Sequence, residues 1–134
     1  MANKTHISHF LLGGFFITAG FMHFVATEDY VAMMPVYLPW HEGLVVLSGV
    51  FEIAGGIGVL LPAQRRFAGI GLIVLLVAVF PANVHVAVHQ LPIGNTYLAP
   101  ALLWARLPLQ LGFLYWVAHQ TLFTEAHDER EFYG

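Results

Sequence analysis

The sequence predicts an all-α protein, an integral membrane four-helix bundle, and three observations support this prediction. The 134 residues are 58% hydrophobic and only 10% charged, whereas soluble domains carry about 25% charged residues. Four stretches approach the ~20 apolar residues that a helix needs to cross a bilayer. No segment alternates apolar and polar residues as a half-buried strand does. The length suits one domain, so we expect residues 1–134 to form a single membrane domain.

The four expected spans cover residues 7–26, 43–61, 67–88 and 101–120. Pro62 follows the second span, Pro92 follows the third and Pro100 precedes the fourth, which are usual positions for proline beside helix ends. The first span is longer than a signal-peptide core and lacks a small-residue cleavage site, so we expect it to be retained. The loop at residues 27–42 is rich in aromatic residues and methionine, as is typical of segments at a membrane interface.

The few basic residues predict an orientation in the membrane. Lys4, the Arg65–Arg66 pair and Arg130 fall on one face after an even number of crossings, and the first and third loops contain no Lys or Arg. By the positive-inside rule, both termini are expected in the cytoplasm and loop 27–42 on the extracytoplasmic side. Five Lys and Arg residues in total form no basic patch for nucleic acid. The absence of cysteine excludes disulfides and thiolate chemistry within this chain.

Two charged residues, Glu52 and Arg106, lie inside the expected spans. Charged groups within a bilayer usually face the bundle interior and find a partner, because exposure to lipid costs at least ~2.5–3.5 kcal/mol. One interpretation is a structural ion pair between Glu52 and Arg106. The alternative is a proton-handling role for Glu52. Ser48, Glu52 and Gly56 share one helix face, and small residues there allow close helix packing or a homo-oligomer.

The remaining polar residues of the spans gather in the extracytoplasmic half, to which all four helices contribute. Pro81 and Pro108 are expected to kink the third and fourth spans beside them. The inner half is almost entirely apolar. The sequence therefore predicts a ligand-binding cluster of His23, Glu52, Asn83, His85, Arg106 and Gln110.

The histidines leave two interpretations open. His85 and His89 share one helix face at i, i+4, a spacing that suits a metal ion, and His23 and Glu52 would complete four ligands. The alternative is that these histidines form hydrogen bonds between helices. His6 and His9 are expected in solvent. The first loop contains Met33, Met34, Tyr37 and Trp40. These side chains are expected either to cap a ligand pocket or to anchor the loop at the membrane interface.

Five short motifs together resemble the DoxX-like membrane proteins. They are residues 20–24 (GFMHF), 35–39, 48–56 (SGVFEIAGG), 81–85 (PANVH) and 106–110 (RLPLQ). The resemblance implies a four-helix bundle in the bacterial cytoplasmic (inner) membrane and an association with redox work, including quinone-linked reactions. Members that exchange thiols use cysteines, so thiol chemistry is not implied for this chain.

These observations lead to three expectations about function. The first is a redox-associated membrane protein that binds a lipophilic molecule, with a quinone as the leading candidate. Glu52 and His23 would then exchange protons or hydrogen bonds with its head, and Arg106 and Asn83 would orient it. The second is a non-catalytic accessory or assembly subunit of a larger membrane complex. The third is a metal-binding membrane protein that uses His85 and His89. The sequence assigns no catalytic residue.

Overall fold

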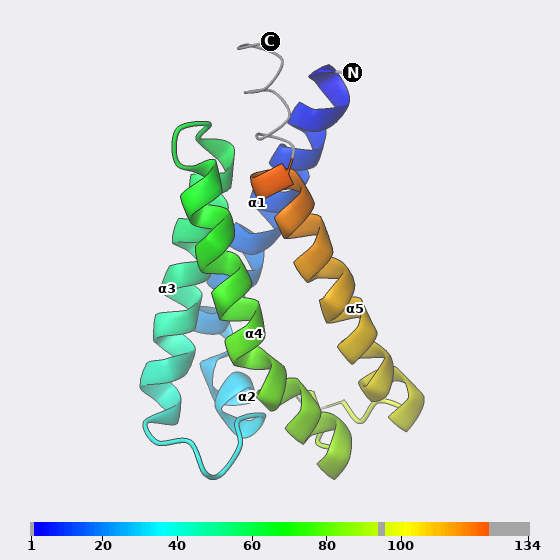
Figure 1. Cartoon of the computed structure of the whole chain (residues 1–134). Helices are drawn as coiled ribbons and strands as arrows, with labels where there is room; N and C mark the ends of the chain where they lie inside the picture. Colours follow the sequence, from blue (N-terminus) through cyan, green and yellow to red (C-terminus); the bar gives the residue numbers. More distant parts are fainter. Residues whose placement is uncertain (1, 94–95, 124–134) are drawn as a thin grey trace.

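The computed structural model describes residues 2–93 and 96–123, and it is helical almost throughout (Figure 1). The expected all-α class is therefore confirmed. Within the described residues, strand-type pairing is limited to an isolated bridge between Ile93 and Thr96. The elements are α1 (Ala2–Val25), α2 (Thr27–Ala32), α3 (His41–Leu60), α4 (Arg65–His89), α5 (Pro100–Ala118) and the π-helical turn η1 (His119–Phe123).

Within the described residues, four helices are long and apolar enough to cross a membrane, and they are the four expected from the sequence. These candidate spans are residues 6–25, 41–60, 65–89 and 100–123. The fourth extends beyond its expected end because η1 continues α5. The connection expected at residues 27–42 begins with a short helix, α2, and Glu28 and Asp29 stabilise its N-terminal turn. Residues 124–134, which the sequence predicts to be a polar tail after the fourth span, lie outside the described residues.

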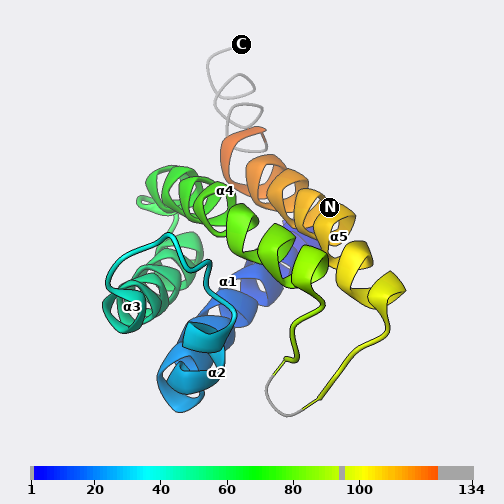
Figure 2. The ribbon, with the colours of Figure 1, turned by 90° about the horizontal axis from the view of Figure 1, so that it is seen from below.

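The helices form a bundle in which chain neighbours are also neighbours in space. Helix α3 packs between α1 and α4, and α5 packs against α4. The stacked rings of Phe15 and Phe113, with centroids 4.9 Å apart, bring α1 and α5 together. The start of α1, the turn at 61–64 and η1 lie at one end, whereas α2 lies at the other (Figure 1). Figure 2, viewed from the α2 end, shows the chain passing from α2 across to α3.

The tightest packing joins α1 to α3 through glycines spaced seven residues apart on each helix. A Cβ atom at Gly20 would lie 2.7 Å from the carbonyl oxygen of Gly49, and a Cβ atom at Gly56 would lie 2.7 Å from that of Gly13. The two backbones approach this closely because no side chain separates them. We call these four residues the glycine seam. The expected close packing at small residues of the second span is therefore present, with α1 against Gly49 and Gly56.

The end of the bundle opposite α2 is held by polar contacts as well as by apolar packing. His9 is only 4% exposed, and its Nε2 lies 2.8 Å from the carbonyl oxygen of Gln120. The expectation that His9 is in solvent was therefore wrong, because η1 folds back against α1 and covers it. Arg65 is also buried, and its Nε donates to the carbonyl oxygen of Val59 at 2.7 Å, near the C-terminal end of α3.

Candidate functional site

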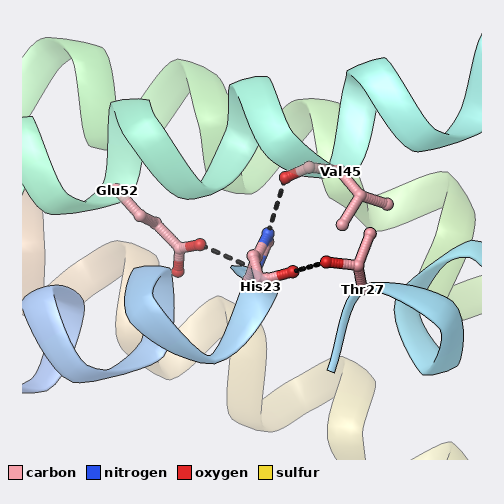
Figure 3. A network of polar contacts seen from close by, with 4 residues as sticks. All are labelled: His23, Thr27, Val45 and Glu52. Carbon is pink, nitrogen blue, oxygen red and sulfur yellow. Dashed lines mark hydrogen bonds and ion pairs between the residues drawn. The ribbon is translucent and has the colours of Figure 1, made fainter. Parts of the chain in front are cut away.

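The centre of the candidate site is a pair formed by His23 of α1 and Glu52 of α3 (Figure 3). Their Nε2 and Oε2 atoms are 2.9 Å apart, and each side chain is 13% exposed. The glycine seam creates this contact, since Gly20 and Gly49 bring the two helices together one turn away from the pair. His23 Nδ1 lies 3.1 Å from the carbonyl oxygen of Val45, and the Thr27 hydroxyl donates to the carbonyl oxygen of His23 at 2.7 Å.

The partners of His23 determine how many protons the pair holds. The carbonyl oxygen of Val45 only accepts hydrogen bonds, so His23 Nδ1 must carry a hydrogen. His23 Nε2 and Glu52 then share a single proton. It lies either on His23, giving an imidazolium beside a carboxylate, or on Glu52, giving two neutral groups. The net charge of the pair is zero in both cases, and the pair holds one transferable proton.

A second hydrogen-bond network connects α5 to α4. Arg106 Nη2 donates to Asn83 Oδ1 at 3.1 Å, and Asn83 Nδ2 donates to Gln110 Oε1. Gln110 Nε2 in turn donates to the carbonyl oxygen of Leu76 at 2.5 Å. This carbonyl lies beside the point where Pro81 removes a helical donor from α4. The amides of Asn83 and Gln110 are thus held in one orientation, and Asn83 holds the guanidinium of Arg106.

Of the two interpretations of the buried charges, the ion pair between Glu52 and Arg106 was wrong. The structure joins Glu52 to His23 and Arg106 to Asn83, and no ion pair links the two charges in the described part of the chain. The physical reason is the order of the helices: α3 presents Glu52 to α1, whereas α5 packs against α4. Arg106 Nη1 is buried and has no hydrogen-bond partner among the described residues. The guanidinium therefore retains a free donor and an unneutralised charge.

The His23–Glu52 pair and the network around Arg106 both face one cavity of about 370 Å³, which we call the polar cavity. His23, Glu52, Asn83 and Arg106 line it, so four of the six predicted site residues come together. Gln110 is buried behind Asn83 and supports it. Met33 and Met34 also line the cavity, which agrees with the interpretation that loop side chains cap a pocket. Tyr37 and Trp40 are each 72% exposed and do not line it.

Tyr30 of α2 is a cavity residue that was not predicted from the sequence. Its ring lies over His23 with centroids 4.2 Å apart. Burial raises the pKa of Tyr30 above its ordinary value of 10.0, the charge of Glu52 raises it further and the charge of Arg106 opposes the rise. The phenol is therefore a neutral hydrogen-bond donor at physiological pH. The available signal was an aromatic residue with a polar tip directly after the first span.

The structure does not bring His85 and His89 into this site. Neither residue lines the polar cavity, and their rings contact each other with centroids 4.4 Å apart. Across residues 2–93 and 96–123, no three His, Asp or Glu side chains lie close enough to hold one metal ion. The expected four-ligand set is therefore not assembled, because His23 and Glu52 meet at the α1–α3 contact while His85 and His89 lie near the end of α4.

The fold and site define a class of protein: a bundle of four long apolar helices, each of which contributes a polar side chain to one cavity. The chain belongs to the family described as "Domain of unknown function (DUF8561)", whose model matches residues 12–121. The match extends from α1 into η1 and includes every residue discussed in the polar cavity. No curated protein and no solved structure matches the chain.

Proposed function

We propose that this chain is a redox-associated, multi-pass protein of the bacterial inner membrane that binds a lipophilic molecule in the polar cavity. A quinone is the ligand class that best fits the groups present. It presents two carbonyl oxygens as hydrogen-bond acceptors, and its reduced form exchanges protons through the same oxygens. The resemblance to DoxX-like proteins supports the redox association and the membrane assignment.

One observation carries this proposal: a pair that shares one proton and a guanidinium with a free donor line the same cavity. The pair is neutral overall, so the cavity as a whole carries about one positive charge, that of Arg106. An uncompensated charge inside a membrane protein is costly, and an electron-rich oxygen against Arg106 Nη1 reduces that cost. A second oxygen can bond the His23–Glu52 pair or the Tyr30 hydroxyl.

The size and lining of the cavity agree with this use. Ligand sites typically occupy about 300–1,000 Å³ and combine apolar walls with a few converging polar groups. Here the walls include Met33, Met34 and the aliphatic side chains of α3 and α4, within a volume of about 370 Å³. The flexible thioethers of the two methionines suit an apolar ring, because methionine adapts its shape to a ligand.

Titration of the purified protein in phosphatidylcholine nanodiscs with a decyl-tailed benzoquinone tests this proposal. We expect saturable binding to the wild type. Glu52→Gln keeps the shape of the side chain but removes the shared proton, so it should weaken binding by about tenfold, the effect of one charge-assisted hydrogen bond. Glu42→Gln is the matched control, since this acid lies on the same helix, is exposed and does not line the cavity. Calorimetry or equilibrium dialysis provides the measurement.

Two results would contradict the proposal: no saturable binding to the wild type, or binding that Glu52→Gln and Glu42→Gln leave equally unchanged. In the first case, recovery of a stoichiometric membrane partner in mild detergent would support the accessory-subunit alternative. The polar network would then serve only to hold the helices of the bundle together.

A further inference from the structure

A second, larger cavity lies along the outside of α3 and α4, and we call it the apolar groove. Its volume is about 720 Å³, and its lining extends on α3 from Leu44 to Gly58, roughly 20 Å at ~1.5 Å per residue. Every lining residue is apolar or glycine except Ser48 and Gln64. Exposed side chains such as Phe51 and Val74 form its walls, so the groove faces whatever surrounds the bundle.

The apolar groove lies directly beside the polar cavity. Four residues line both: Leu44 and Ser48 on α3, and Leu75 and Ala78 on α4. These four side chains are therefore the boundary that a molecule with its head beside Glu52 and Arg106 and its tail in the groove has to pass. The two spaces differ in chemistry at this junction. The polar cavity contains the ionisable groups, and the apolar groove is long, apolar and larger in volume.

We propose that the ligand of this protein is a single-tailed amphiphile, whose head occupies the polar cavity and whose linear hydrocarbon tail lies in the apolar groove. This inference rests on the proposed function and extends it to the ligand's tail and to the path by which the ligand reaches the cavity. The ligand enters sideways from the lipid between α3 and α4, so its tail remains in an apolar environment throughout. The shared chemistry is an oxygen-bearing head on one chain, which both a prenylated quinone and a fatty acid provide.

Gly71 allows a specific test, because it lines the apolar groove but not the polar cavity. A Cβ atom at Gly71 would meet no atom within 4 Å, so the side chain introduced by Gly71→Leu starts in open space within the groove. Gly112→Leu is the matched control. Gly112 lies within α5 with the same open space around it, and it lines neither cavity. Thermal unfolding of both variants verifies that the fold is kept.

The experiment uses full-length protein in phosphatidylcholine nanodiscs and three ligands: a decyl-tailed benzoquinone, the same benzoquinone with methyl in place of decyl, and oleate. Each variant is compared with the wild type for one ligand at a time, so partitioning into lipid cancels. Gly71→Leu should weaken binding of the tailed quinone by about fivefold, because the leucine takes the place of about two methylenes and removes their van der Waals contacts with the groove. Those methylenes move into lipid and not into water, so no hydrophobic transfer energy adds to this effect. Binding of the tail-less quinone should change less than about twofold, and Gly112→Leu should affect neither.

The outcomes separate this inference from the function on which it rests. Wild-type binding of both quinones, with Gly71→Leu leaving the tailed one unchanged, overturns the tail assignment but retains the quinone site. A Gly71→Leu effect on oleate without quinone binding supports the tail assignment and replaces the quinone with a carboxylate head. An equal loss for tailed and tail-less quinone also overturns the inference, because the substitution would then act on the head. No binding of any of the three ligands rejects both proposals.

Discussion

Each charged side chain in the polar cavity is fixed in place by hydrogen bonds to neighbouring groups. His23 is held by Val45 and Glu52, and Arg106 is held by Asn83, which Gln110 supports in turn. The residues of the site therefore differ in what they contribute. His23 and Glu52 share a proton, and Arg106 provides charge and a free donor. The amides of Asn83 and Gln110 set the position of Arg106. Tyr30 covers His23 and responds to both charges of the cavity.

Tyr30 provides a spectroscopic measure of the Glu52 charge. Glu52→Gln should lower the pKa of Tyr30 towards its ordinary value, because the carboxylate is one of the causes that raise it. Ultraviolet titration of tyrosinate measures this change, and Tyr30→Phe identifies the signal that belongs to residue 30. Since the pKa is raised by folding, the stability contributed by Tyr30 is complete below pH 10.0 and is lost as pH rises through the folded-state pKa. An unchanged Tyr30 titration in Glu52→Gln would show that the two groups are not coupled.

At the scale of elements, the glycine seam determines where His23 and Glu52 meet. A Cβ atom at Gly20 would lie 2.7 Å from the Gly49 carbonyl oxygen and 2.9 Å from Cβ of Glu52. Backbone atoms cannot move aside as the end of a flexible side chain can. The spacing of α1 and α3, and with it the 2.9 Å contact of the pair, therefore depends on the absence of side chains at the seam.

Gly20→Ala should destabilise the bundle by about 1–3 kcal/mol, the usual cost of overpacking a tight contact. Gly14→Ala is the control on the same helix, since a Cβ atom there meets nothing within 4 Å. It should be neutral or stabilising by about 0.5–1 kcal/mol because alanine favours helix more than glycine does. Denaturant unfolding in detergent, followed by circular dichroism, measures both free energies. Equal stability of the two variants would be inconsistent with a tight seam.

At the scale of the whole molecule, the bundle has two chemically different ends. The start of α1, the 61–64 turn and η1 share one end, and α2 lies at the other (Figure 1). The polar cavity lies towards the α2 end, where Tyr30, Met33 and Met34 line it. The Arg65–Arg66 pair lies at the first end. If this end faces the cytoplasm, as the positive-inside rule predicts, the polar cavity lies in the extracytoplasmic half of the membrane.

The absence of cysteine makes this orientation directly measurable. Glu28 on α2 and Ala63 in the turn after α3 lie at opposite ends of the bundle, outside the four candidate spans. In intact spheroplasts, a membrane-impermeant thiol reagent should label Glu28→Cys at once and Ala63→Cys only after permeabilisation. The reverse pattern would invert the predicted orientation, and labelling of both in intact cells would show that the helices do not cross the membrane as proposed.

The sequence by itself determined the helical class, the positions of the four long helices and most of the polar residues in the cavity. These properties follow from local composition, because a long apolar stretch forms a helix in an apolar solvent whichever neighbours it has. Even the correct inward direction of Glu52 followed from small residues on its own helix.

Only the tertiary structure decided which of these groups meet. The partner of Glu52 is His23 rather than Arg106, Tyr30 belongs to the cavity, His9 is buried, and His85 and His89 lie outside the site. Each outcome depends on the order of helices around the bundle and on their rotation. Packing between distant segments sets both, at positions such as the contact of Gly20 with Gly49. Hydropathy and spacing within a single helix contain no information about the neighbour across that contact.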